Sequence, residues 1–149
     1  MRISFDLDDT LIAKKRFPLE KEPFVAKLLG AERLRLGTIT LFKALRNKGH
    51  QIGVYTTSYR SKAKIKRMFW AYGLSVDYVV NQQLHERTLG KRSKSISKYP
   101  PAFEIDLHID DSLGVEREGD LHGFSTVIVA MDDLQWMDKI LERVDGTTI

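Results

Sequence analysis

The sequence predicts an α/β fold in which a parallel sheet is covered by helices on both faces. Two observations lead to this prediction: short apolar runs that suit buried strands, and helical apolar patterns between those runs. Strands that alternate with helices favour parallel pairing, because the chain crosses back over the sheet before each new strand. The 149 residues are enough for one domain, so we expect a single domain over residues 1–149.

Five apolar runs are predicted to form the strands. The first, second and fourth runs end on polar residues, and each of these three is rich in residues that suit buried strands. The runs span Ile3–Leu7, Ile52–Thr56, Val76–Val80, Ile105–Ile109 and Ser125–Ala130. We expect a doubly wound sheet of strand order 3-2-1-4-5, in which the first strand lies between the second and the fourth.

Apolar residues at helical spacing predict three helices. The first contains Ile39, Phe42 and Leu45, and Gly49 is a plausible stop for it. The other two are marked by their apolar residues, which are Ile65, Met68, Phe69 and Tyr72 before Gly73, and Leu134, Met137, Ile140 and Leu141 near the end of the sequence.

Residues 13–36 and 81–104 are rich in charge and have little periodicity, and the second segment contains Pro100 and Pro101. Both segments follow a predicted strand, so both can emerge near strand ends. Neither is long enough to fold as an independent cap domain. We therefore expect loops or short helices beside the site, and no large cap.

The strongest functional pattern is Phe5-Asp6-Leu7-Asp8-Asp9-Thr10-Leu11, at the end of the first strand. Two carboxylates two residues apart on a strand that is about to turn can share one site. Asp6 would attack a phosphoryl group and form an aspartyl phosphate, while Asp8 protonates the leaving oxygen and later activates water. The competing interpretation is an Asp-rich turn that only caps the next segment.

A second acidic pattern, His108-Ile109-Asp110-Asp111-Ser112, follows the fourth strand. Adjacent carboxylates repel each other, so they indicate a cation or an unusual proton. A Mg²⁺ ion with ligands from Asp6, the Asp8 backbone, Asp110 and Asp111 would offset that repulsion, although a turn or helix cap explains the pair equally well. For His108 we expect a hydrogen-bonded core histidine and not a metal ligand.

Two weaker patterns complete the candidate site. Thr56 and Thr57 follow the second strand, where a hydroxyl and the N–H groups of a helix start can hold a phosphate oxygen; an ordinary N-cap is the alternative. Lys98 precedes the fourth strand, and its ammonium would keep the nucleophile ionised and neutralise the transferring group. Lys91 and Lys94 are the rival lysines. In the expected strand order all these groups converge on one crevice.

These residues resemble the motifs of the haloacid dehalogenase superfamily of phosphatases. Asp6-Leu7-Asp8-Asp9-Thr10 is similar to the family's first motif, Thr56 to its second, Lys98 to its third and Asp110-Asp111 to its fourth. Within the pair, Asp111 resembles the metal ligand, with Asp110 as the alternative. The resemblance implies a Rossmann-like core, a bound Mg²⁺, an aspartyl-phosphate intermediate and a small member without a large cap.

Several other functions compete with a phosphate monoesterase. A dehalogenase needs neither an acid at Asp8 nor a metal, and a phosphomutase normally needs a cap. A two-component receiver would carry its acceptor Asp after a middle strand, where this sequence has Thr56 and Thr57. A non-catalytic phosphate-binding or regulatory module on the same fold is the main alternative to an enzyme.

The composition bears on the expected cellular location and on the expected binding partners. The chain has no cysteine, so disulfides and thiolate metal sites are excluded, and without an apolar leader or span we expect a cytoplasmic protein with no membrane partner. The net charge of +4 suits a phosphorylated substrate, either a small molecule or a macromolecule. Nucleic acid is a less favoured partner, because no aromatic pattern accompanies the basic residues that follow strand ends, which are Lys14, Lys15, Arg16, Arg60, Lys62, Lys91, Arg92 and Lys94.

Overall fold

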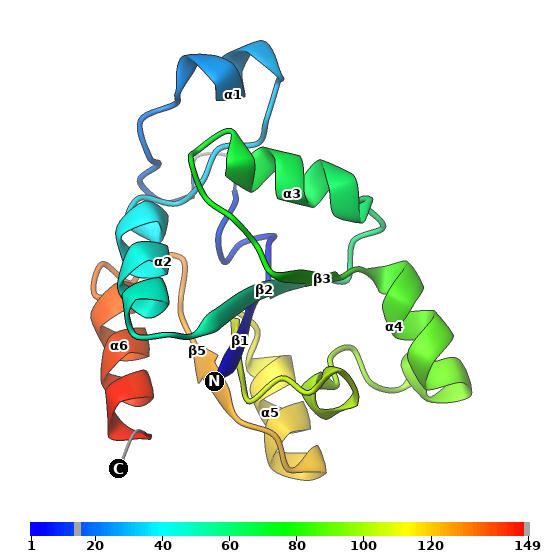
Figure 1. Cartoon of the computed structure of the whole chain (residues 1–149). Helices are drawn as coiled ribbons and strands as arrows, with labels where there is room; N and C mark the ends of the chain where they lie inside the picture. Colours follow the sequence, from blue (N-terminus) through cyan, green and yellow to red (C-terminus); the bar gives the residue numbers. More distant parts are fainter. Residues whose placement is uncertain (14–15, 148–149) are drawn as a thin grey trace.

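The computed structural model describes residues 1–13 and 16–147, in which short strands alternate with helices (Figure 1). The strands are β1 (Arg2–Phe5), β2 (Gln51–Tyr55), β3 (Tyr78–Val80), β4 (Leu107–Asp110) and β5 (Thr126–Ile128). The α-helices are α1 (Phe24–Leu28), α2 (Thr38–Asn47), α3 (Lys62–Trp70), α4 (Gln82–Leu89), α5 (Leu113–His122) and α6 (Trp136–Gly146). Two 3-10 helices, η1 (Gly90–Lys94) and η2 (Pro100–Phe103), lie between α4 and β4 in this part of the chain.

The five strands form one parallel sheet in the order β3-β2-β1-β4-β5, as the sequence predicted. In the register, Ile3 of β1 lies opposite Ile52 on one side and Leu107 on the other. The chain moves outward from β1 to β2 and β3, then returns to β4 on the other side of β1. The carboxyl ends of β1 and β4 therefore meet at the point where the strand order reverses, as in Rossmann-like sheets.

Side chains of the central strands pack on both faces of the sheet. On one face Phe5 contacts Phe42 of α2, and Phe42 stacks on Phe69 of α3, with ring centroids 5.1 and 5.5 Å apart. A smaller apolar cluster around Tyr55 and Val80 includes Leu84 of α4 and Phe103 of η2. Because side chains alternate across a strand, Val54 joins the larger cluster while Tyr55 joins the smaller one.

A buried arginine ties the N-terminal turn to the C-terminal part of the chain. Arg35 is 2% exposed, and its guanidinium lies between the rings of Phe17 and Trp136, at 4.7 and 4.6 Å from their centroids. Its N–H groups donate to backbone carbonyls of Thr10, Ala130, Met131 and Asp133. The turn after β1 and the segment before α6 are thus held by the same side chain.

The helices expected from periodicity are present with shifted ends. The helix predicted to reach Gly73 ends at Trp70, and the last helix begins at Trp136, so Leu134 lies before it and is exposed. Helix α5 was not specifically predicted, because its two glycines weaken the helical pattern. A Cβ at Gly119 would lie 2.8 Å from the Phe124 carbonyl oxygen, so the close turn into β5 requires a glycine. Among the helices of residues 1–13 and 16–147, none is long and apolar enough to cross a membrane.

The two segments without periodicity contain short helices and loops, as predicted. The first forms α1 and isolated bridges between Ile12 and Leu34 and between Leu19 and Arg35. Figure 1 shows α1 at the outer end of the molecule, beyond α3. The second segment forms α4, η1 and η2. The basic residues Lys14 and Lys15 lie outside the described residues.

Candidate active site

Asp6 lies directly after β1, at the edge of the sheet where the carboxyl ends of the strands meet. Its backbone N–H donates to the Ile109 carbonyl of β4 at 2.9 Å, which continues the sheet pairing. The chain then turns, and the N–H groups of residues 10–12 all donate to the Leu7 carbonyl. Asp9 takes the left-handed conformation in this turn (φ 65°), which Asp adopts more readily than most residues. The turn therefore fixes the backbone on which Asp6 sits.

Lys98 places a buried ammonium between two carboxylates. Its Nζ lies 3.0 Å from Asp6 Oδ1 and 2.9 Å from Asp110 Oδ2, and the residue is only 2% exposed. Burial alone would lower the pKa of Lys98, but the two carboxylates raise it above its usual value, so the side chain stays charged. Lys91 and Lys94 are exposed on η1, so Lys98 is the lysine that the fold brings to Asp6.

Both carboxylate oxygens of Asp110 are occupied by protein groups. Oδ2 accepts from Lys98 and from Nε2 of His108, each at 2.9 Å, and Oδ1 accepts from the Ser112 N–H at 3.0 Å. Burial alone would raise the pKa of Asp110, but the hydrogen bond from His108 and the charge of Lys98 hold it well below its usual range. Asp110 is therefore ionised, and it holds the Lys98 ammonium by an ion pair.

Asp111 is the less engaged member of the pair. It is half-buried, and its Oδ1 accepts from the Thr10 hydroxyl at 3.1 Å. Among the described residues, the Thr10 hydroxyl is the only side-chain donor to this carboxylate. Burial and the neighbouring charge of Asp110 raise the pKa of Asp111. A cation near this carboxylate would relieve the repulsion.

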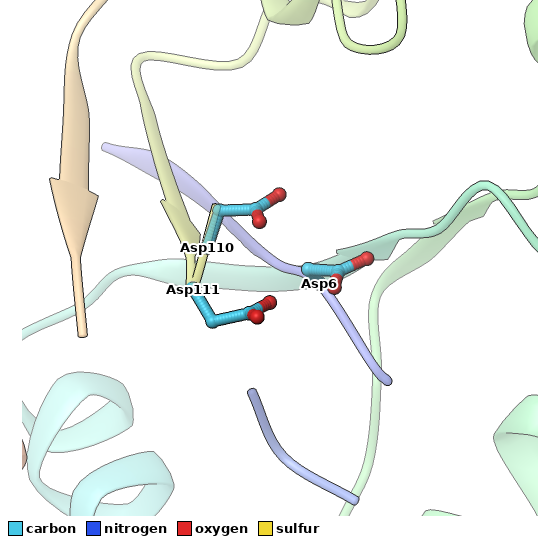
Figure 2. A group of neighbouring side chains, drawn as sticks. All are labelled: Asp6, Asp110 and Asp111. Carbon is cyan, nitrogen blue, oxygen red and sulfur yellow. The ribbon is translucent and has the colours of Figure 1, made fainter. Parts of the chain in front are cut away.

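Three carboxylates form a group that could hold a metal ion. One oxygen from each of Asp6, Asp110 and Asp111 lies within 4.8 Å of the others, and Figure 2 shows the side chains of Asp110 and Asp111 extending toward the side on which Asp6 lies. Carboxylate oxygens are the donors that Mg²⁺ and Ca²⁺ prefer. Three carboxylates around one ammonium carry excess negative charge, so the donor set fits a divalent cation. The side chain of Asp8 is not in this group, and for Asp8 only a backbone ligand was expected.

The pKa of Asp6 reports the same excess of negative charge. The pKa of Asp6 is raised to about 7 in total: burial raises it most, Lys98 lowers it by charge and by a hydrogen bond, and the charges of Asp110 and Asp111 also raise it. A cation placed among the three carboxylates would favour the ionised form of Asp6. The nucleophilic form of this side chain would thus depend on positive charge beyond that of Lys98.

His108 is a hydrogen-bonded core histidine, as the sequence predicted. It is fully buried, with Nδ1 2.7 Å from the Ser4 hydroxyl and Nε2 2.9 Å from Asp110 Oδ2. Burial lowers the pKa of His108 to about 4, so the ring is neutral at pH 7. A neutral ring protonated on Nε2 donates to Asp110 and accepts from Ser4, which satisfies all three groups.

The backbone around Lys98 is clamped by a carboxylate that sequence reasoning missed. Glu118 of α5 accepts from the N–H of Ser97 at 2.9 Å, from the Ser97 hydroxyl at 2.7 Å and from the N–H of Lys98 at 3.1 Å. The spacing of Glu118 gave no signal, because an exposed acid in a helix is ordinary. The contact is visible only once α5 is packed beside the segment that precedes β4.

Tyr55 and His85 hold the same segment from the other side. The Tyr55 hydroxyl lies 2.6 Å from His85 Nδ1 and accepts from the Tyr99 N–H at 2.9 Å, while His85 Nε2 lies 2.9 Å from the Ile96 carbonyl oxygen. Burial lowers the pKa of His85, so the neutral ring donates from Nε2 and accepts at Nδ1. Lys98 is thus fixed from both sides by partners distant in sequence.

The residues expected to hold phosphate lie on the loop after β2. Thr56 is buried, and its hydroxyl oxygen accepts from the Ser58 N–H at 3.1 Å. Thr57 is exposed and lines a cavity of about 430 Å³ together with Ser97 and Glu118. The loop ends at Ser61, the N-cap of α3, which accepts from the Lys64 N–H. The N-cap of α3 is therefore Ser61 and not Thr56. The Thr56 hydroxyl is only an acceptor among the described residues, so its proton is available to a ligand.

Asp8 is exposed and bound by an arginine. Nη1 and Nη2 of Arg60 donate to the two Asp8 oxygens at 2.9 and 3.1 Å, and Nη2 also donates to Glu32 Oε1 at 2.8 Å. Sequence reasoning placed Arg60 only among solvated basic residues. This ion pair joins residues 52 positions apart and leaves no local pattern in the sequence.

The fold therefore brings Asp6, Lys98, Asp110 and Asp111 into direct contact or close proximity, and places Asp8 two residues along the same turn. Thr56 follows the strand adjacent to β1. A comparison with models of known protein families found none that matches the chain, and a comparison with curated proteins found no match. The geometry and chemistry of these residues are therefore the basis for the function proposed below.

Proposed function

We propose that this protein is a Mg²⁺-dependent phosphatase of the haloacid dehalogenase type that cleaves a phosphate monoester through an aspartyl phosphate on Asp6. One observation carries the proposal: buried Lys98 is held 3.0 Å from Asp6 and 2.9 Å from Asp110, with an Asp111 oxygen inside the same group. This constellation lies at the reversal point of the strand order, where such sheets bind ligands.

In the first step Asp6 acts as the nucleophile. Its Oδ1 is held by Lys98, so Oδ2 attacks phosphorus while the bond from phosphorus to the leaving oxygen breaks. The leaving oxygen keeps the bonding electron pair and takes a proton from Asp8, which must first leave Arg60 and bind that proton from solvent. A Mg²⁺ ion held by Asp6, Asp110, Asp111 and the Asp8 backbone would supply charge neutralisation to the phosphoryl oxygens.

In the second step Asp8 acts as a base. Now ionised, it takes a proton from water, and the water oxygen attacks the phosphorus of the aspartyl phosphate. The bond from phosphorus to Asp6 breaks, inorganic phosphate leaves, and Asp6 and protonated Asp8 are regenerated. Asp110 does not react, because both its oxygens are hydrogen-bonded.

The loop after β2 would hold the transferred group. The Thr56 hydroxyl accepts from Ser58, which leaves its proton free to donate to a phosphate oxygen. Thr57 is exposed beside it and offers a second hydroxyl and its backbone N–H. Lys98, whose ammonium lies 3.0 Å from Asp6, would be a further donor to a group attached to Asp6.

A non-catalytic phosphate-binding or regulatory module is the second candidate. The observation in its favour is that both oxygens of Asp8 accept from Arg60, which keeps Asp8 from acting on a substrate. A module that only binds phosphate could keep this ion pair permanently. An enzyme must open it in every turnover.

A turnover assay with Asp6→Asn separates these functions. Wild-type protein with Mg²⁺ is screened over nucleotides, sugar phosphates, phosphopeptides and phosphorylated oligonucleotides by release of inorganic phosphate. The best substrate is then given to Asp6→Asn, which we expect to be inactive but folded, since the side chain lies at a strand end and not in the apolar core. Substantial activity of Asp6→Asn would refute the covalent mechanism, and a screen without turnover would favour the binding module.

A further inference from the structure

A small basic cavity lies beside Asp8, apart from the carboxylates that surround Lys98. It has a volume of about 130 Å³ and is bordered by α3 and by the segment that follows α1. Three basic side chains line it, and Glu32 is the single acidic residue in that lining. The basic residues are Arg60, Lys64 and Arg67. Positive charge concentrated in a concave site favours an anionic ligand.

Arg60 is held in place at the boundary between this cavity and the turn that carries Asp8. Its backbone N–H donates to the Ser58 hydroxyl at 3.1 Å, and its carbonyl accepts from Asn81 Nδ2 at 3.1 Å. Its guanidinium bridges Asp8 and Glu32. A guanidinium with two adjacent donors is suited to carboxylate or phosphate groups, which accept two parallel hydrogen bonds.

Lys64 and Arg67 supply charge that the protein does not neutralise. They lie three positions apart on α3 and so share one helix face. In the described ranges neither side chain forms a salt bridge, in contrast to Arg60. Lys62 and Lys66 belong to the same helix but line a different cavity with Asp77 and Glu104. The basic face toward Asp8 is therefore distinct from the rest of the helix.

We propose that this cavity binds a second anionic group of the substrate, so that the preferred phosphate esters carry a carboxylate or a second phosphate on the leaving group. This inference rests on the proposed phosphatase function and names its substrate class. The second anion would take the place of Asp8 in the bidentate contact with Arg60, with Lys64 and Arg67 as further partners.

Replacement of Asp8 by a substrate anion at Arg60 would also link substrate binding to the acid–base step of the reaction. With Arg60 bound, both Asp8 oxygens are occupied by N–H donors and neither can face a leaving oxygen. A substrate anion that occupies the guanidinium leaves Asp8 free to turn toward the ester. Substrates without that anion must break the ion pair without a replacement, so they react more slowly.

The test uses esters matched in chain length. They are alkyl phosphates, ω-carboxyalkyl phosphates and alkanediol bisphosphates, each with three- and five-carbon chains. We expect kcat/KM of the wild-type protein to be at least about tenfold higher for one or both anionic classes than for the alkyl esters, as expected for charge-assisted contacts. The two anionic classes show whether the site takes carboxylate or phosphate. Equal kcat/KM for all classes at both lengths would overturn the proposal.

Variants in α3 test whether this cavity is the source of the preference for anionic esters. The double variant Lys64→Gln/Arg67→Gln should reduce the ratio of anionic to alkyl kcat/KM by about tenfold or more. The matched control Lys62→Gln/Lys66→Gln removes the same charge from the same helix and should preserve the ratio. Glu32→Gln removes the competing carboxylate and should increase the ratio. If the control lowers the ratio as much as the cavity variant does, the preference is a general charge effect and the site is refuted.

A binding measurement separates this proposal from the proposed function. Titration calorimetry of Asp6→Asn with Mg²⁺ should give a Kd for the anionic esters at least about tenfold below that of the alkyl esters. If the anionic esters bind more tightly than the alkyl esters but the wild-type protein hydrolyses none of them, the anion site is supported and the phosphatase function is rejected. If the wild-type protein hydrolyses all the esters and Asp6→Asn binds them with equal Kd, the phosphatase function is supported and the anion site is rejected.

Discussion

Asp6 and Asp110 face the same ammonium but have different surroundings. Asp110 receives hydrogen bonds on both oxygens, and its pKa lies well below the usual range. Asp6 accepts a hydrogen bond from Lys98 on Oδ1, and burial raises the pKa of Asp6 to about 7. Environments that separate the pKa values of two carboxylates give them different roles. Asp6 is therefore suited to react, and Asp110 to hold Lys98.

Asp8→Asn tests the acid–base role at the scale of one side chain. Asparagine keeps the shape and the backbone carbonyl but removes both proton transfers, each worth typically ~10²–10⁴-fold in rate. We expect a large loss of kcat on an alkyl phosphate and a milder loss on an activated aryl phosphate, whose leaving group needs no proton. Steady-state kinetics on both substrates is the measurement.

The phosphoenzyme provides a control for Asp8→Asn. Hydrolysis of the aspartyl phosphate still needs a base, so the variant should accumulate phosphoprotein on the aryl substrate, detectable by intact-protein mass spectrometry. Near-native and equal rates on both substrates would exclude the role of Asp8, and with it the main reason for preferring ester hydrolysis to the alternatives.

The sequence predicted which carboxylates lie close together at the strand ends, but not the residues that hold their neighbours in place. Asp6, Asp110 and Asp111 follow apolar strands, and strand order alone brings strand ends together. Lys98 was one of three lysines, and only the packing of η1 and the following segment selects it. Arg60 could not be found, because an ion pair between residues 52 positions apart leaves no periodic signal.

At the scale of elements, α5 is linked to the proposed chemistry through Glu118. Glu118→Gln removes the negative charge and replaces one of the two acceptor oxygens by an NH₂ donor, which would face the N–H of either Ser97 or Lys98. We expect kcat to fall about tenfold with little change in KM, as for a loss of charge-assisted hydrogen bonds that position Lys98.

The matched control for this variant is Glu116→Gln, an exposed glutamate on the same helix. It should leave both kinetic constants near the wild-type values. A loss in Glu118→Gln that appears only in thermal stability and not in kcat would show that the clamp is structural and does not position Lys98.

Helix α4 makes the stability of the fold depend on pH through His85. Burial lowers the pKa of this histidine below its usual 6.5, so as the pH falls below 6.5 the unfolded chain binds a proton before the folded chain does. The contribution of His85 to the free energy of unfolding should therefore fall as the pH is lowered from 7 to 5, by at most about 1.4 kcal/mol per pH unit. The lowered pKa of His108 adds a change of the same sign, and the raised pKa of Asp6 adds one of the opposite sign, so the slope is compared between the wild type and a variant. Urea unfolding across this range measures the slope.

His85→Gln identifies the source of the slope. Glutamine does not titrate, so the variant should lose stability at every pH but show a shallower decrease between pH 7 and 5. If the wild type and the variant have the same slope, His85 is not the group that binds the proton.

Element boundaries could be predicted less well than element types. Strands predicted from apolar runs were found within a few residues, because a strand buried on both faces is nearly continuous in apolar residues. Leu134 fits the helical pattern of α6 yet lies in the preceding turn, where Arg35 holds the neighbouring Asp133 carbonyl. A tertiary contact thus sets the start of the helix.

At the scale of the whole molecule, metal binding should stabilise the fold. Asp6, Asp110 and Asp111 come from two strands whose ends meet only in the folded state, so a cation held by all three would stabilise that state. We expect Mg²⁺ at a hundredfold excess over its Kd to stabilise the fold by about 2.7 kcal/mol and to raise Tm by about 5–10 °C, and a chelator to abolish activity. Differential scanning calorimetry measures the shift.

Asp111→Asn is the control for the metal. It removes a carboxylate without removing a partner of Lys98, so the protein should fold but show a reduced Mg²⁺ shift. Full hydrolysis of phosphate esters in the presence of a chelator would contradict the metal requirement.

The position of β1 at the centre of the sheet has a consequence for synthesis. Asp6 precedes its partner Lys98 by 92 positions, and its neighbour β4 follows later still. Arg35 likewise precedes its carbonyl partners Ala130 and Asp133 by 95 and 98 positions. A nascent chain emerging from the ribosome therefore carries the proposed nucleophile without the groups that would activate it. Products of interrupted translation would be inert toward phosphate esters and exposed to proteolysis.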